Sequence, residues 1–147
     1  MTFGQDLAKF AQKAGDNMDI VVRTITLELA TAVVERTPVG YPPGWKSPAP
    51  QGYVGGRLRA NWQFSAGAPL TTQLDTTDHA GVLTKIAAAV DATAAGGITW
   101  LSNNLPYAVP VEFEGHSGQA PEGMVRVSVT EAQQHVNKAM AALKGAG

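Results

Sequence analysis

The chain is 147 residues long, enough for one domain with a buried core, and only 16% of its residues are charged. The net charge of -1 disfavours nucleic-acid binding, which needs a clustered positive excess, and the lack of cysteine excludes disulfides and Cys-ligated zinc. No apolar run approaches the ~20 residues that span a bilayer, and the N-terminus lacks the pattern of a secretory signal. We expect a single domain over residues 1–147 of a soluble protein made in the cytosol.

Residues 1–35 have apolar side chains at helical spacing. The stripe consists of Leu7, Phe10, Ala14, Met18, Val22, Ile25, Leu29 and Ala32. The pattern predicts a long N-terminal helix, which Gly15 and Asp16 can divide into two. The helix is expected to end at Thr37, because the next residue is Pro38 and proline disfavours a helical conformation in the residue before it.

Residues 38–56 form a long loop rich in proline and glycine. The loop holds five of the nine prolines and five glycines, together with three large aromatic residues, Tyr41, Trp45 and Tyr53. Structureless loops longer than ~12–15 residues are uncommon in compact domains and are usually functional or disordered. Aromatic side chains favour burial, which a simple linker does not offer. The composition predicts either an arm that docks on a neighbouring subunit or a loop folded back over its own domain.

Two segments have the features of β-strands. Residues 60–66 alternate, with Trp62 and Phe64 on one face, which is the period of a half-buried strand. Residues 98–103 are rich in β-branched and aromatic residues. The antiparallel partner of the first strand is expected after Gly67, at Leu70, Thr72 and Leu74.

Three further helical segments are expected. Residues 83–94 follow helical spacing, with Gly96-Gly97 as a C-terminal stop. Asn104 is the expected cap of a short helical turn that starts near Pro106. A last helix is predicted over residues 122–143.

That last helix has an apolar stripe with steps of three and four residues. The stripe consists of Val125, Val129, Ala132, Val136, Ala139 and Leu143. Residues 124–129 alone also permit a strand, because valine favours strands. The order of elements predicts an α+β fold, with helices that cover one face of a small and mainly antiparallel sheet.

The sequence offers little catalytic chemistry. Glu112, Glu114 and His116 alternate and can in principle ligate a metal, but acidic turns with a nearby histidine are common, and we expect no metal here. Residues 115–118 superficially resemble a nucleophile elbow but lack its second glycine. We therefore expect no catalytic residue, no metal and no cofactor. A small hydrolase, which requires a pocket with a perturbed histidine or carboxylate, is the least supported reading.

Arg57 and Arg59 flank Leu58 just before the first predicted strand. Two charges are too few to define a DNA-binding face, and a salt bridge to a neighbouring subunit or a solvated edge is favoured. The alternative is a DNA-binding phage protein that uses Arg57, Arg59, Arg126 and nearby lysines. It predicts a DNA affinity that falls with salt.

Three blocks of residues occur in a specific order along the chain. They are Arg36-Thr37-Pro38-Val39 with Gly56-Arg57-Leu58-Arg59-Ala60-Asn61-Trp62, then Trp100-Leu101-Ser102-Asn103-Asn104-Leu105-Pro106-Tyr107-Ala108 with Val111-Glu112-Phe113-Glu114-Gly115, and then Gln119-Ala120-Pro121-Glu122-Gly123-Met124-Val125-Arg126. This ordered set resembles the neck or tail-completion proteins (minor tail, head–tail joining) of long-tailed bacteriophages. Residues 40–55 depart from the family, because shorter relatives have a tight turn there.

The resemblance implies a non-enzymatic structural protein of the virion, assembled in the cytoplasm of a bacterial host. It implies a ring, usually a hexamer, stacked between the head-closure (connector) protein and the tail terminator protein. Such a ring joins the tail to a DNA-filled head and leaves a channel for the DNA. The tail terminator ring itself is the close alternative. Because aromatic residues are enriched at interface hot spots, the expected subunit-interface residues are Tyr41, Trp45, Tyr53, Arg57 and Arg59.

Overall fold

The computed structural model describes residues 18–40, 43, 47–93, 97–113, 117–132, 134, 136–138 and 141. Their helices are α2 (Met18–Arg36), α3 (Arg57–Ala60), α4 (Val82–Asp91), α5 (Ala108–Phe113) and α6 (Val125–Thr130), and their strands are β1 (Gln63–Ala66) and β2 (Thr99–Ser102). The two strands pair antiparallel, with Phe64 opposite Leu101. Helices combined with a small antiparallel sheet confirm the predicted α+β class.

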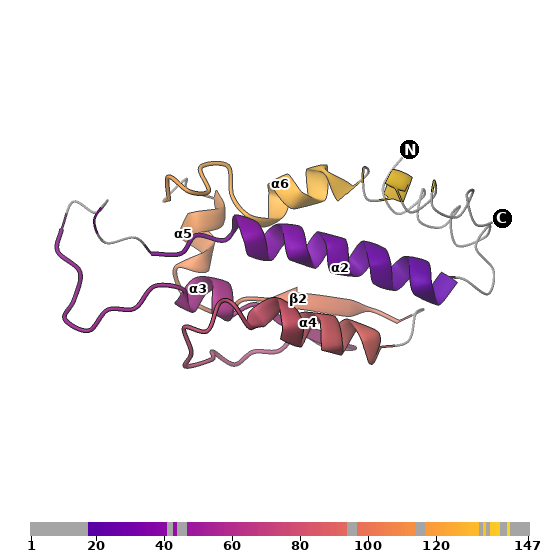
Figure 1. Ribbon diagram of the computed structural model, residues 1–147, viewed down its shortest axis with the longest axis horizontal. Helices are drawn as coiled ribbons and strands as arrows, with labels where there is room; N and C mark the ends of the chain where they lie inside the picture. The colour runs from indigo at the N-terminus through magenta and orange to yellow at the C-terminus, as the bar shows by residue number, and fades with distance from the viewer. Residues whose placement is uncertain are drawn as a thin grey trace.

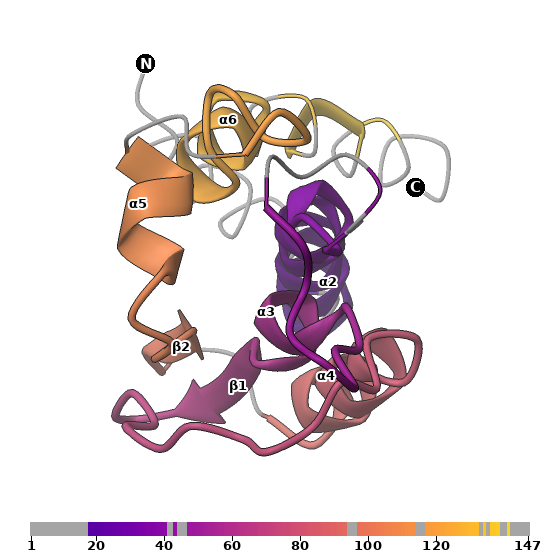
Figure 2. The same cartoon turned by 90° about the vertical axis from the view of Figure 1, so that its left-hand side faces the viewer.

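Helix α2 runs through the middle of the described structure. α6 lies on one side of it, and α4 and the sheet lie on the other side (Figures 1 and 2). α3 and α5 lie near the C-terminal end of α2 (Figure 1). Because α2 is covered on more than one side, its buried residues do not form the single predicted stripe. Val21, Ala30 and Val34 are buried together with Ile25, whereas Leu29 is only half-buried.

The main hydrophobic core draws on almost every element. Its buried members are Ala30, Val33, Val34, Leu58, Trp62, Val82, Ile86, Val90, Leu105, Ala108, Val111, Ala120 and Met124. Phe64 and Leu101, the facing pair of the sheet, are partly buried against it. In the described residues no helix combines the length and the apolarity that a membrane crossing requires.

The first strand is shorter than predicted and has a different partner. Residues 57–60 form α3, so β1 begins at Gln63 rather than at Ala60. Its partner is β2, and the prediction of a strand at Leu70, Thr72 and Leu74 is wrong. Residues 70–74 are held by side-chain amides instead of by strand pairing. The amides of Asn61, Gln63 and Asn104 donate hydrogen bonds to backbone carbonyls of this segment.

The predicted strand at residues 98–103 and the predicted helix at residues 83–94 are both present with shorter limits, as β2 and α4. α4 ends at Asp91, before the Gly96-Gly97 stop, and the Thr93 hydroxyl donates to the carbonyl of Ala89 at 2.8 Å. Asn104 does not cap a helix, because its amide donates to the carbonyl oxygens of two preceding loop residues. α5 instead begins at Ala108, two residues after the expected position.

Helix α6 begins at Val125, and residues 132, 134, 136–138 and 141 are also helical, so the strand interpretation of residues 124–129 is wrong. The buried face matches the predicted stripe at Ala132 and Val136 and departs from it earlier in the helix, where Ser128 is fully buried and Val129 is 50% exposed. The Ser128 hydroxyl donates to the Met124 carbonyl at 2.7 Å and accepts from Arg36 Nη1 at 3.0 Å. Arg36 also pairs with Glu131 at 2.6 Å, which joins α2 to the chain after α6.

The Thr37 hydroxyl connects the end of α2 to the residue before β1. Thr37 is completely buried, and its Oγ1 donates to the Val33 carbonyl at 2.7 Å and accepts from Trp62 Nε1 at 2.7 Å. Arg59 donates from Nε to the Thr37 carbonyl at 2.9 Å and from Nη2 to the Glu35 carbonyl at 3.1 Å. The last carbonyls of a helix have no intrahelical partner, so this guanidinium satisfies acceptors that the helix end leaves open.

Replacing Thr37 with valine removes this hydroxyl and leaves the buried Trp62 indole N–H without an acceptor. We expect T37V to lower the free energy of unfolding in urea by about 1–3 kcal/mol. The double variant T37V/W62F also removes the N–H, so its loss is expected to be smaller than the sum of the two single losses. A T37V variant within about 0.5 kcal/mol of wild type contradicts this role.

Candidate subunit interface

The structure describes three of the five residues predicted for a subunit interface. Tyr41 and Trp45 lie outside the described residues. Tyr53 is 39% exposed, Arg57 is exposed, and Arg59 is half-buried with its guanidinium on the carbonyls at the end of α2. The structure therefore gives Arg59 an intramolecular role.

The two ends of the 38–56 loop touch each other. A Cβ built on Gly40 would lie 1.9 Å from the Tyr53 hydroxyl, and a Cβ built on Gly55 would lie 2.5 Å from the Gly40 carbonyl oxygen. Only glycine fits at such close approaches. Tyr53 thus packs over the start of the loop, and the chain leaves and re-enters the domain at nearly one point.

Gln119 fixes this point to the rest of the domain. Its Nε2 donates to the Val39 carbonyl at 2.8 Å, and its Oε1 accepts from the Val39 N–H at 3.2 Å. The side-chain amide therefore binds both backbone groups of Val39, as a neighbouring strand would. The described residues 47–52 lie away from the helices, on the left in Figure 1. We call residues 41–52 the arm and residues 38–40 with 53–55 its base.

Tyr53 and Arg57 share their surroundings with Tyr107. Burial raises the pKa of the Tyr107 phenol above its usual value, the positive charge of Arg57 opposes this, and Tyr53 adds to the increase. The side chains of Tyr53 and Tyr107 are 39% and 43% exposed, so this cluster presents two aromatic rings and one cation beside the arm base.

Helix α5 adds an apolar surface that the sequence analysis did not single out. Val109 and Phe113, one turn apart, are 59% and 61% exposed. The Arg126 guanidinium lies 4.8 Å from the centre of the Phe113 ring, a cation–π contact. The spacing of Val109 and Phe113 was visible in the sequence, but their exposure depends on which face of the short helix meets the core.

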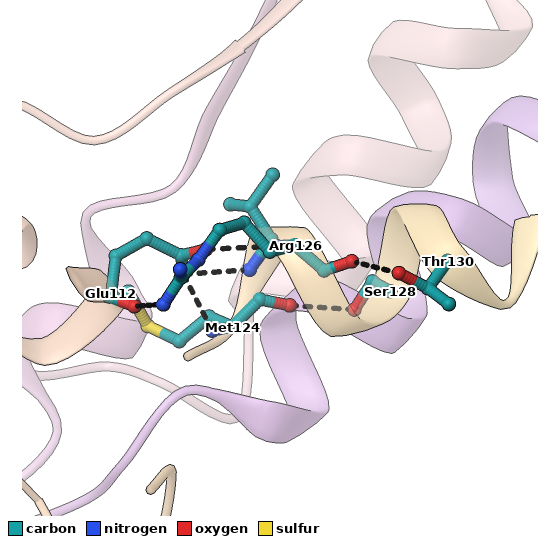
Figure 3. A network of polar contacts seen from close by, with 6 residues as sticks. Glu112, Met124, Arg126, Ser128 and Thr130 are labelled. Carbon is teal, nitrogen blue, oxygen red and sulfur yellow. Dashed lines mark hydrogen bonds and ion pairs between the residues drawn. The ribbon is translucent and has the colours of Figure 1, made fainter. Parts of the chain in front are cut away.

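Glu112 holds the start of α6, as Figure 3 shows. Its Oε2 accepts from the N–H groups of Met124 at 2.5 Å and Val125 at 2.8 Å, and its Oε1 accepts from the N–H of Arg126 at 2.8 Å. Arg126 Nε adds an ion pair at 3.3 Å. The carboxylate therefore satisfies the open N–H groups of a helix start, where a negative charge is favoured. Gly123 permits this approach, because a Cβ there would lie 2.6 Å from the Glu112 carbonyl oxygen.

These contacts bear on the metal and DNA hypotheses. Both Glu112 oxygens already accept several donors, and Glu114 and His116 lie outside the described residues. In the part of the chain that the structure describes, no group of three histidine or acidic residues is placed to hold a metal. Two arginines of the DNA-binding hypothesis have partners within the chain, since Arg59 donates to carbonyls at the end of α2 and Arg126 pairs with Glu112 at the start of α6.

No protein-family model, curated protein or solved structure matches this chain. The function is therefore argued from the geometry above and from the ordered sequence blocks.

The hydrogen bonds to Glu112 predict a pH dependence of stability. Burial raises the pKa of the Glu112 carboxyl. Hydrogen bonds lower this pKa by more, so that it lies below its usual value; the donors are the N–H groups of Val125, Arg126 and Met124 and the Arg126 side chain. Its ionised form therefore stabilises the fold above the unfolded pKa of about 4.3, and this contribution is lost as the pH falls through the folded pKa.

We expect E112Q to lower the free energy of unfolding by about 1–3 kcal/mol at neutral pH. The difference between wild type and E112Q should shrink as the pH falls below about 4, because only the wild-type side chain titrates there. Urea denaturation of both proteins over a series of pH values measures this difference. A difference that stays constant over the acidic range contradicts the assigned role.

Proposed function

We propose that this protein is a structural component of the bacteriophage neck, where it forms a ring between the head-closure protein and the tail terminator protein. The ring joins the tail to the DNA-filled head, and the DNA passes through its channel. The protein has no catalytic activity and needs no cofactor. The finer arrangement, with a long N-terminal helix, a C-terminal helix and a protruding 38–56 loop, belongs to this proposal.

The observation that carries the proposal is the fixed base of the arm. Residues of the first and third blocks that resemble the neck family build this base and its support. Thr37 ends α2, Val39 is held by Gln119, and Arg59 closes the helix end. A rigid scaffold that presents a loop is the usual arrangement for a binding element.

The composition of the arm supports contact with protein rather than with nucleic acid. Its only charged residue is Lys46, and it carries Tyr41 and Trp45 between prolines. Aromatic side chains provide large contact areas and are enriched at interface hot spots. The DNA-binding alternative requires a basic face, whereas four of the five arginines donate hydrogen bonds within the chain: Arg23, Arg36, Arg59 and Arg126.

The tail terminator ring is the second candidate. It shares the size and the α+β class, and it differs from the neck ring in its partners rather than in its chemistry. Mixing experiments with separated heads and tails distinguish the two by the partner that the protein binds.

Deletion of residues 41–54 tests the arm as an assembly element. Gly40 and Gly55 already touch, so a direct junction fits, and the shorter loop adds no closure cost. We expect the deletion variant to unfold in urea within about 1 kcal/mol of wild type. Added to phage heads and tails that lack the protein, it should restore about tenfold fewer infectious particles than wild type, or less. A variant that loses clearly more than about 1 kcal/mol of stability but restores as many infectious particles as wild type would make residues 41–54 a cover for the core.

Two tryptophans provide a matched pair of substitutions. Trp62 is 6% exposed in the core, whereas Trp45 belongs to the arm. We expect W62A to lower the free energy of unfolding by about 3–5 kcal/mol. W45A is expected to leave it within about 0.5 kcal/mol of wild type and to weaken subunit association instead. Urea denaturation and sedimentation of both variants measure the two effects, and a W45A variant that loses stability but associates normally excludes Trp45 as an interface anchor.

A further inference from the structure

An apolar groove lies between α2 and the sheet, away from the arm. α2 contributes Val22, Ile25 and Leu29, and the sheet contributes Phe64, Trp100 and Leu101. The remaining lining residues, Thr26, Ala30 and Thr99, are also uncharged. Trp100 is 40% exposed and the neighbouring Ile98 is 69% exposed, so apolar surface extends from the groove to the outside. Exposed apolar surface of this kind marks an interaction site.

The size of the groove fits side chains of a protein partner. Its volume is ≈ 270 Å³, below the roughly 300–1,000 Å³ of sites for small-molecule ligands. None of its lining residues is charged, and most of them are apolar, so the groove favours an apolar occupant over a charged one. Aromatic and proline side chains are the occupants that an uncharged, partly aromatic groove accepts best.

The groove lies along the first and middle turns of α2, whereas the arm follows its C-terminal end. Thr26 in the groove precedes Thr37 at the helix end by 11 residues, which corresponds to about 16 Å along the axis. The arm base is held at the C-terminal end by Val39 and Gln119. In Figure 1 the arm residues 47–52 lie beyond that end of the helix. The described part of the arm therefore extends away from the domain.

We propose that the arm of one copy, residues 41–52, docks into the groove between α2 and β2 of the next copy in the ring. This inference rests on the proposed function and names the contact that closes the ring. The two surfaces match in chemistry, since the groove is uncharged and the arm has one charge. Proline lacks an N–H, so the arm buries few unsatisfied donors. Because the arm and groove are different surfaces, the contact is head-to-tail, the type that generates rings when its rotation closes.

The absence of cysteine from the chain allows a direct cross-linking test. Ser47, exposed in the arm, and Thr26, in the groove, are replaced with cysteine in separate full-length proteins. After mixing and oxidation, S47C with T26C is expected to give a covalent dimer, twice the 15.3 kDa of one chain, on a non-reducing gel. The double variant S47C/T26C should give a ladder of multimers.

The matched control is T31C, on the same helix but facing Gln134 and Lys138. S47C with T31C is expected to remain a single chain, as are S47C and T26C alone. Ring formation without an S47C–T26C cross-link overturns the docking contact and leaves the proposed function intact. A bond formed only within one chain of the double variant also overturns it, because the arm then fills its own groove. A wild-type protein that stays monomeric, both alone and with phage heads or tails, contradicts the proposed ring independently of the docking contact.

Discussion

The structure depends on one buried hydroxyl, that of Thr37. Its hydrogen bonds to the Val33 carbonyl and the Trp62 indole fix where α2 ends and where the largest core side chain enters. Both bonds lie in the interior, where a donor left without a partner costs more than the bond itself contributes. The helix, the core and the chain that leads to β1 are therefore fixed together. Arg59 adds a hydrogen bond at the same junction, since its Nε donates to the Thr37 carbonyl.

The direction of the arm follows from this junction. The chain leaves α2 at Thr37, is held at Val39 by Gln119 and returns at Gly55, where the two segments of the arm base touch. A second junction, at the Glu112 carboxylate, fixes the start of α6. Both junctions thus place helix ends. Exposed surfaces of the described residues include the arm, the aromatic cluster beside its base, the apolar face of α5 and the groove along α2.

Local features of the sequence located the end of α2, the start of α4 and the position of β2. These features are Pro38, the helical spacing after residue 82, and the β-branched and aromatic residues at 98–103. Such local features failed where side chains form long-range hydrogen bonds. Asn61 and Asn104 hold the segment that was expected to be a strand. Ser128 is buried in place of Val129 because Arg36 and a carbonyl satisfy its hydroxyl. The intramolecular role of Arg59 had no signal in the spacing, since its acceptors lie 22 and 24 residues away.

The measurement that tests the neck assignment most directly is the mass of the purified full-length protein in solution, alone and after mixing with phage heads or tails that lack it. A closed multiple of the 15.3 kDa chain, or recovery of infectious particles on mixing, is the predicted result. A monomer that ignores both partners and binds duplex DNA with an affinity that falls steeply with salt would contradict the assignment.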